Sequence, residues 1–385
     1  MNTIKIGEVC DILNGFAFKS GNYTEQGIRV LRITNVQKGL IVDDDPKYYP
    51  FDEETNLKQY MLKEGDLLMS LTGNVGRVGL LQKNLLPAAL NQRVACLRIK
   101  NSNIQLEYIF HLLNSDCFER DCIFNATGIA QKNMSTEWLK KYNIPIPSLS
   151  EQQSIVAELD KINELISLKK AQLSDLDSLA QSIFYDMFGD PIENEKGWEV
   201  KKYGDCFTIG AGGTPSKSQK EYWENGNIPW IGSNMCQNCI IKETDGRFIT
   251  EEGLNHSSAK LLDVDTVLVA LVGATIGKVA LLKTKTSTNQ NVAFIKVNES
   301  DDFISEYVYF HLMNQYSEFL LIGNGDFKMA NQAFIKSLSI MMPPLSLQQE
   351  FAKRIELIEQ QKAQISSTIK DLETLLASRM QYWFD

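Results

Sequence analysis

The 385 residues are enough for two or three domains, each with its own core. Hydrophobic residues make up 43% and charged residues 23%, as in ordinary globular proteins, and no apolar run approaches the roughly 20 residues that span a bilayer. The N-terminus lacks a signal peptide's apolar segment, and the seven scattered cysteines suit a reducing compartment, so we expect a cytoplasmic protein.

The net charge of −9 argues at first against binding to nucleic acid, which usually needs a basic face. However, residues 150–189 hold seven acidic against three basic residues, and 346–385 hold six against five. The rest of the chain is only mildly acidic and leaves room for a locally basic groove.

Patterns in the first part of the chain return about 200 residues later in the same order, which predicts a tandem duplication. The repeated pairs are Leu67–Leu81 with Val267–Leu282, Asn91–Ala95 with Asn289–Ala293, and Phe110–Asn114 with Phe310–Asn314. Within each copy, short β runs punctuated by Gly and Asn surround one helical stretch, near 104–121 and 303–320. We therefore predict an α+β fold with two globular units at 1–149 and 190–345, each followed by a long helix at 150–189 and 346–385.

A Pro lies just upstream of each long helix, and at each helix start a Ser is followed three residues later by a Gln. The pairs Ser150/Gln153 and Ser346/Gln349 predict capping boxes, and Gly189 predicts the end of the first helix.

Apolar residues alternate at steps of four and three along both helices, which favours a coiled coil because one helix cannot hide such a stripe from water. We expect the seam to contain Ile155, Leu159, Ile162, Ile166, Lys169, Leu173, Leu176, Ala180, Ile183 and Met187 of the first helix, and Phe351, Ile355, Ile358, Lys362, Ile365, Ile369, Leu372, Leu376, Arg379 and Trp383 of the second. The seam lysines either extend to solvent along their stems or fix the register of the helices.

The motifs of common catalytic and cofactor sites are not matched. The stretch 273–278 has three residues between its glycines and Val279 after the Lys, so a turn between two strands is favoured over a phosphate-binding loop. Cys236 and Cys239 form one C-x-x-C with no second pair nearby, which disfavours zinc. Met342-Pro343-Pro344-Leu345 lacks the flanking residues of an amino-methyltransferase motif. His111 and His311 are interpreted as core residues, and we expect no catalytic or metal site.

Polar, amide-rich loops remain, and Asn, Gln, Arg and Lys are the residues that bond base edges and phosphates. In the first unit, we predict DNA contacts from Lys19, Ser20, Arg29, Arg32, Thr34, Asn35, Asn74, Arg77, Asn91, Gln92 and Arg93. In the second unit, the candidates are Thr214, Ser216, Lys217, Trp230, Ser233, Asn234, Thr275, Lys278, Asn289, Gln290 and Asn291. For each residue taken singly, surface solvation is the better explanation of its polarity, and the set on duplicated loops is what suggests DNA contact.

With its duplicated Leu-Ser-x-Gln-Gln helix starts, paired glycine turns and two Asn-Gln repeats, the whole chain resembles a specificity subunit of type I restriction–modification enzymes. The stretch Gly212-Gly213-Thr214-Pro215-Ser216 also resembles a frequent opening of the family's recognition domains. The first unit departs from it with Asn14-Gly15-Phe16-Ala17-Phe18-Lys19.

The resemblance implies two target-recognition domains, each reading half of a gapped, bipartite DNA site, and two spacer helices that pair antiparallel. It implies no cofactor on this chain, two methyltransferase partners that carry S-adenosylmethionine, and a motor partner that uses ATP and Mg. Off-seam Leu165, Leu168, Leu179 and Phe184 are expected to dock these partners or, alternatively, to pack against the recognition domains. Two rival hypotheses are a self-sufficient DNA methyltransferase or nuclease, and a coiled-coil scaffold without a DNA role.

Overall fold

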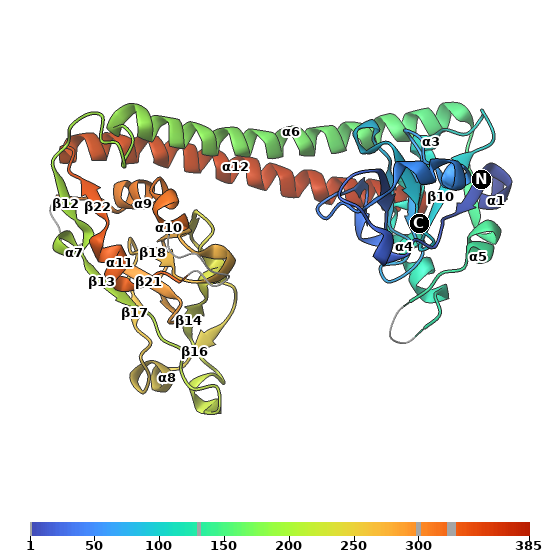
Figure 1. Cartoon of the computed structure of the whole chain (residues 1–385). Coiled ribbons are helices and arrows are strands. Elements are labelled where there is room, and N and C mark those ends of the chain that lie inside the picture. Colours follow the sequence, from blue (N-terminus) through green and yellow to red (C-terminus); the bar gives the residue numbers. More distant parts are fainter. Residues whose placement is uncertain (1, 129–131, 298–301, 322–328) are drawn as a thin grey trace. The chain divides into compact units, whose positions relative to one another are not determined.

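The computed structural model describes residues 2–128, 132–297, 302–321 and 329–385 (Figure 1). They form two compact units, one made of Met1–Ala171 with Ser366–Asp385 and the other of Gln172–Ile365. Each long helix is therefore divided between the two units, with one part of it belonging to each.

The first unit is built around a four-stranded antiparallel sheet in the order β2 (Cys10–Asn14), β10 (Val94–Ile99), β7 (Leu67–Ser70) and β8 (Val78–Leu80). Successive side chains of a strand point to opposite faces, so Leu67 and Met69 enter one core while Leu68 enters another. Burial on both faces of β7 explains the continuous apolar run in that strand.

A smaller sheet, β6 (Tyr48–Tyr49), β3 (Ile28–Leu31) and β9 (Ala88–Leu90), lies in the same unit, and β1 (Asn2–Lys5) pairs with β11 (Asn143–Ile146). The other elements are α1 (Ile6–Val9), η1 (Ser20–Asn22), η2 (Ile33–Asn35), β4 (Val36–Gln37), β5 (Leu40–Ile41), η3 (Phe51–Glu53), α2 (Glu54–Leu57), η4 (Lys58–Tyr60), η5 (Lys83–Leu85), α3 (Leu106–Leu113), α4 (Asp116–Asn125) and α5 (Thr136–Lys141).

The second unit repeats this plan with a five-stranded sheet, β13 (Thr208–Ala211), β21 (Val292–Lys296), β18 (Val267–Ala270), β19 (Val279–Leu282) and β15 (Cys239–Ile241). Again Val267 and Val269 enter one core and Leu268 the other. Its smaller sheet is β16 (Phe248–Ile249), β14 (Ile228–Ile231), β20 (Thr286–Thr288) and β17 (Leu261–Leu262), and β12 (Val200–Lys202) pairs with β22 (Ser339–Met341). The other elements are α7 (Tyr203–Cys206), η6 (Lys220–Tyr222), η7 (Ser233–Met235), α8 (Glu251–Asn255), η8 (Gly273–Thr275), α9 (Ser305–Met313), α10 (Tyr316–Leu320) and α11 (Gln332–Ser337).

The long helices are α6 (Leu149–Phe188) and α12 (Leu345–Phe384), of 40 residues each. They pair antiparallel: in the first unit Lys170 of α6 binds Glu373 of α12 at 2.9 Å, and in the second Lys362 of α12 binds Asp177 of α6 at 2.8 Å. The predicted fold class, with two α/β units in tandem and two antiparallel long helices, is confirmed. Across the described ranges, no helix has the length and apolar character needed to cross a membrane.

The predicted seam positions are buried or half-buried along both helices. Ile155 and Leu159 enter the core of the first unit with α12 residues such as Leu376 and Trp383. Lys362, a seam lysine, is half-buried and its ammonium binds Asp177 of the opposite helix as well as Glu359 of its own. Polar seam residues therefore link the two helices as well as packing between them.

Two expectations about local structure are wrong. The capping box of α6 is formed by Ser148 and Glu151, whose backbone N–H groups and side chains bond reciprocally, two residues before the predicted pair Ser150 and Gln153. The single helical stretches expected near 104–121 and 303–320 are each two helices; in the first, Ser115 caps a new start at α4 by accepting the Phe118 N–H at 3.2 Å. Phe184, for which partner docking and packing against a recognition domain were both left open, is fully buried in the core of the second unit, so the packing alternative holds.

Candidate nucleic-acid interface

In each unit, the turn that joins β7 to β8 or β18 to β19 lies beside the segment that carries the Asn-Gln repeat. We call residues 71–77 and 271–278 the glycine turns, and 91–93 and 289–291 the Asn-Gln segments. The Leu71 N–H donates to the Arg93 carbonyl at 2.9 Å, and the Leu271 N–H donates to the Asn291 carbonyl at 2.8 Å. The fold thus gathers two groups of candidate residues that are separated by more than ten positions in the sequence.

The second glycine of each turn is required by its backbone conformation and by close packing. Gly76 and Gly277 have φ angles of +83° and +74°, a region that side chains rarely adopt. A Cβ on Gly76 would meet the Cys122 sulfur at 2.8 Å, and one on Gly277 would meet the Phe319 side chain at 2.6 Å. These turns join β7 to β8 and β18 to β19, as predicted, and their glycines allow a neighbouring helix to approach closely.

The cation of each glycine turn is bound by a glutamine that the sequence did not single out. Arg77 Nη1 donates to Gln37 Oε1 at 2.6 Å, and Lys278 Nζ donates to Gln237 Oε1 at 2.8 Å. Both glutamines lie two residues beyond a 3-10 turn, η2 or η7. The equal spacing of Gln37 and Gln237 from these turns becomes visible only in the structure, so no sequence pattern indicated the two residues.

The opening loops of the two units differ in sequence but share one glycine. A Cβ on Gly15 would meet the Asn91 backbone at 2.3 Å, and one on Gly212 would meet the Thr288 carbonyl at 2.2 Å. Each glycine therefore lets its loop pass directly over the chain at or just before the Asn-Gln segment. Beyond it, Phe16 and Phe18 pack edge-on in the first unit, whereas Trp223 and Trp230 do so in the second.

Among the first-unit candidates, the two early arginines are paired with carboxylates. Arg29 contacts Asp43 and its Nε donates to the Leu85 carbonyl at 3.2 Å. Arg32 binds Asp45 at 3.1 Å, and Lys47 and Arg32 together lower the pKa of the Asp45 carboxyl, which keeps it ionised. The positive charge of these arginines is thus largely offset within the chain.

The remaining first-unit candidates divide by exposure. Asn35 is 3% exposed and uses its amide to accept from Arg32 N–H and to donate to the Val42 carbonyl, so it holds the turn together. Asn91 is also buried and accepts from the Arg93 N–H at 3.1 Å. The exposed candidates are Lys19, Ser20, Thr34, Asn74, Gln92 and Arg93.

In the second unit, hydrogen bonds bring several candidates together. Thr214 Oγ1 donates to Gln290 Oε1 at 2.5 Å, and the Asn291 N–H donates to Asn289 Oδ1 at 3.0 Å. Trp230 is buried and its indole N–H donates to the Gly213 carbonyl at 3.0 Å. Ser216, Lys217 and Asn234 are exposed, and Ser233 and Thr275 are half-buried.

Arg247 joins this surface although it was not a candidate. Its guanidinium lies over the Trp230 ring at 5.0 Å and donates to Asn234 Oδ1 at 3.3 Å, while Asp245 binds it at 2.5 Å. Its role arises from the pairing of β14 with β16, which no short sequence pattern indicated.

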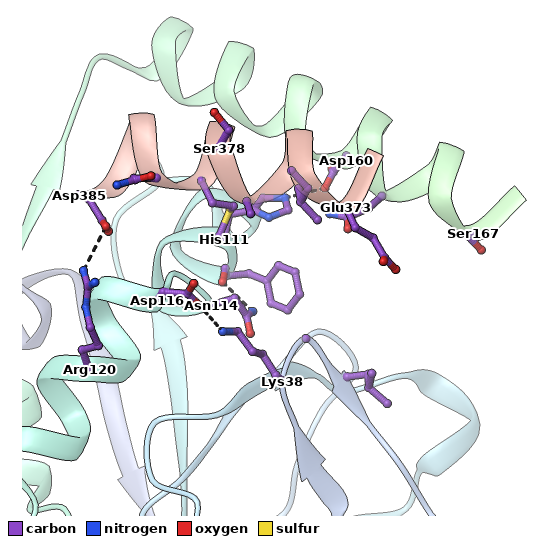
Figure 2. A pocket seen from close by; sticks show the side chains of 18 residues that line it. Lys38, His111, Asn114, Asp116, Arg120, Asp160, Ser167, Glu373, Ser378 and Asp385 are labelled. Carbon is purple, nitrogen blue, oxygen red and sulfur yellow. Dashed lines mark hydrogen bonds and ion pairs between the residues drawn. The ribbon is translucent and has the colours of Figure 1, made fainter. Parts of the chain in front are cut away.

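A groove of about 1030 Å³ opens within the first unit between α3, α4, the β4–β5 hairpin and the two long helices (Figure 2). His111 Nε2 contacts Asp160 at 2.7 Å on its wall, and burial lowers the pKa of His111 although Asp160 opposes this shift. Its lining includes four acidic side chains, Asp116, Asp160, Glu373 and Asp385, against Lys38 and Arg120. This groove therefore does not suit a phosphate backbone.

Known proteins resemble the whole chain. It is 24% identical over 411 residues to the putative MjaX specificity subunit of Methanocaldococcus jannaschii, which covers 97% of this chain and 92% of that protein. It is 30% identical over 184 residues to the MjaVIII specificity subunit of the same organism, covering 47% of this chain and 43% of that protein. The EcoR124I/EcoR124II specificity subunit of Escherichia coli is 27% identical over 269 residues, 65% of this chain and 62% of the relative. The chain thus spans less than two thirds of the length of these last two relatives.

Two solved structures share the fold. The S subunit of a type I restriction–modification system from M. genitalium superposes with a TM-score of 0.55 at 14% identity, covering all of this chain and 96% of that one. A chain from a structure of a type I R-M system superposes with a TM-score of 0.60 at 18% identity, covering all of this chain and 97% of that one. The sequence also matches the family described as type I restriction modification DNA specificity domain over residues 1–177 and again over 195–374. The chain therefore belongs to this family and carries its domain twice.

Proposed function

We propose that this chain is the DNA sequence-recognition subunit of a type I restriction–modification complex, and that each unit reads one half of a gapped, bipartite site. The observation that carries the proposal is the duplicated scaffold with two different polar surfaces. The glycine turns and Asn-Gln segments form equivalent backbone hydrogen bonds in both units, whereas the loops over them differ in sequence and in aromatic packing. One scaffold that presents two different surfaces suits the reading of two different half-sites.

The exposed side chains provide the chemistry of such reading. Amide groups, as on Gln92 and Gln290, match the paired donor and acceptor of adenine in the major groove, and a guanidinium, as on Arg93, matches guanine. Asn74 and Lys217 lie exposed in loops, and we expect them to contact bases or phosphates. The buried Asn35, Asn91 and Trp230 shape the loops that present these groups.

We propose that α6 and α12 set the spacing between the half-sites. A helix of 40 residues is about 60 Å long at 1.5 Å per residue, comparable to one or two turns of DNA. Adding one heptad to both helices at facing positions is expected to lengthen the gap in the recognised site without altering either half. An unchanged gap would contradict the spacer role.

Catalysis and its cofactors are proposed to lie on partner subunits. Two methyltransferase subunits would supply S-adenosylmethionine chemistry, and a motor subunit would supply cleavage with ATP and Mg. Leu168 and Leu179 of α6 are 57% and 47% exposed, large apolar side chains that suit a protein partner. Leu165 is half-buried beside them in the sequence, and the buried Phe184 is no longer part of this surface.

The docking proposal is tested with charge substitutions. Leu168→Asp and Leu179→Asp are expected to reduce co-purification of the methyltransferase subunits with the tagged chain. Ser174→Asp adds the same charge on another face of α6, five residues before Leu179, and is expected to leave assembly intact. Intact assembly in all three variants would refute docking at these leucines.

The function itself is tested by sequencing modified bases in the host genome with and without the gene. Loss of methyladenine from one gapped motif on deletion is expected and would reveal both half-sites. Replacing 190–345 with the matching domain of a relative should then change one half-site only. Methylation or cleavage by the isolated chain would instead support a self-sufficient enzyme. Absence of sequence-dependent DNA binding in the purified complex would support a scaffold.

A further inference from the structure

We propose that Gln37 and Gln237 are positioning residues that hold Arg77 and Lys278 ready to contact DNA phosphates. The proposal rests on the DNA-reading function above and adds residues to it. It arises from an arrangement of side chains that occurs twice, at equivalent places in the two units.

Each glutamine is bonded at both ends of its amide. Gln37 Nε2 donates to the Thr34 carbonyl at 2.9 Å while its Oε1 accepts from Arg77 at 2.6 Å. Gln237 Nε2 donates to the Asn234 carbonyl at 3.1 Å while its Oε1 accepts from Lys278 at 2.8 Å. The glutamine thus bridges the 3-10 turn and the glycine turn, and its orientation is fixed by both bonds.

The neutrality of this partner distinguishes these two cations from their neighbours. Arg32 in the first unit and Arg247 in the second bind carboxylates, which offset their charge. An amide orients a cation without cancelling its charge. In the described parts of the chain, neither Arg77 nor Lys278 forms an ion pair, so each keeps its full charge for an external anion.

The backbone around each cation is also fixed. The Arg77 N–H donates to Ser70 Oγ at 3.2 Å, and the Gly76 N–H donates to the Ser70 carbonyl at 3.0 Å. In the second unit, the Gly277 N–H donates to the Ala270 carbonyl at 2.9 Å. A cation held in place before binding loses less conformational freedom when it meets a phosphate.

The position suits DNA. The glycine turns adjoin the Asn-Gln segments, which carry the exposed amides Gln92 and Gln290. Phosphate contacts fix the register of a protein on the duplex, and base contacts then specify the sequence. Arginine and lysine both fulfil the first task, which explains why one unit has Arg77 and the other Lys278.

The test uses the complex purified from the host through a tag on this chain, and a labelled 30-base-pair duplex of random sequence as the probe. Binding is followed by fluorescence anisotropy over a series of NaCl concentrations. Gln37→Glu places a carboxylate against Arg77 without changing side-chain length. We expect it to weaken binding roughly three- to tenfold in low salt and to lower the salt slope by about one.

Further variants separate positioning from charge. Arg77→Ala is expected to match Gln37→Glu, and the double variant should be no worse than either. Gln37→Met removes the hydrogen bond but adds no charge, so it should weaken binding while the salt slope stays unchanged. Gln82→Glu, an exposed site in the same unit, is the matched charge control and should behave as wild type. Gln237→Glu and Lys278→Ala repeat the test in the second unit.

The outcomes distinguish the two proposals. Wild-type complex that does not bind the duplex at any salt concentration would overturn the DNA-reading function itself. Normal wild-type binding, with Gln37→Glu and Arg77→Ala indistinguishable from Gln82→Glu, would overturn only the role of the glutamine-held cations. Melting temperatures of the variants are measured in parallel, and a salt slope reduced by about one in a variant of wild-type stability supports the proposal.

Discussion

The backbone N–H of Gln105 donates a 2.9 Å hydrogen bond to the buried side-chain oxygen of Gln152, the first glutamine of the Ser-x-Gln-Gln helix start. The amide nitrogen of Gln152 donates to the carbonyls of Pro147 and Asn103. Gln348 of α12 repeats the pattern with the Ile304 N–H and the carbonyls of Pro343 and Asp302. The motif therefore ties each long helix to the loop that precedes the short helix α3 or α9.

We predict that Gln152→Ala lowers the free energy of unfolding by about 1–3 kcal/mol, because buried backbone groups lose their partners. Urea denaturation followed by circular dichroism measures the change. Gln153 is the neighbouring glutamine and is exposed, so Gln153→Ala is expected to stay within about 0.5 kcal/mol of wild type. Equal effects of the two substitutions would show that the bridge contributes nothing.

The ion pair between Glu158 of α6 and Arg379 of α12 predicts a measurable coupling in the first unit. Both oxygens of Glu158 accept from Arg379, Trp383 Nε1 also donates to Glu158 at 3.0 Å, and Arg379 lowers the pKa of Glu158. A double-mutant cycle with Glu158→Gln and Arg379→Gln should give a favourable coupling that shrinks in 1 M NaCl. It should exceed the coupling of the single-contact pair Arg354–Glu350 on the surface of α12. A coupling that is absent or insensitive to salt would contradict an electrostatic link.

Because His311 is buried, we predict that the free energy of unfolding falls on mild acidification. Complete burial lowers its pKa from 6.5 to about 3, while Tyr203 contacts Nδ1 at 3.1 Å and the Met341 N–H donates to Nε2 at 3.2 Å. Between these pH values the unfolded chain binds a proton that the folded chain does not, so stability falls as the pH falls below about 6.5. The slope approaches about 1.4 kcal/mol per pH unit.

Unfolding of wild type and His311→Asn at pH 8, 7, 6 and 5 measures this contribution. The variant is expected to be less stable at pH 8 but to lose less further stability between pH 6.5 and 5. Parallel stability profiles over that range would show that His311 does not titrate as proposed.

We predict that truncating Phe184, near the end of α6, lowers the free energy of unfolding by a large amount. It is fully buried, and its ring centroid lies 5.7 Å from the ring centroid of Phe351 of α12 and 6.0 Å from that of Tyr307 of α9. Phe184→Ala should cost about 3–5 kcal/mol through lost burial and an unfilled cavity. Leu179→Ala, on the exposed side of the same helix, should cost less than about 1 kcal/mol in thermal or chemical unfolding. A small effect at Phe184 would mean that this core rearranges to fill the space.

The sequence by itself determined the duplication, the helix seam and the glycine turn between two strands of each main sheet, because each leaves a local or periodic pattern. Leu159 and Ile355 recur at helical spacing because a long apolar stripe must be covered. Gly189 ends α6 because its φ of +81° suits glycine. The DNA contacts themselves remain predictions, since exposure and adjacency describe a surface but not its ligand.

Only the tertiary structure decided which polar residues face outward and which support the fold. Asn35 and Thr34 are neighbours of similar polarity, yet the first is buried in a turn and the second is exposed. Gln37 accepts a hydrogen bond from Arg77, 40 residues further along the chain. The guanidinium of Arg247, next to β16, lies over the ring of Trp230 on the paired strand β14. Such contacts join positions distant in the chain, and hydrogen-bond partners depend on how the loops fold over the sheets, which the sequence pattern does not encode.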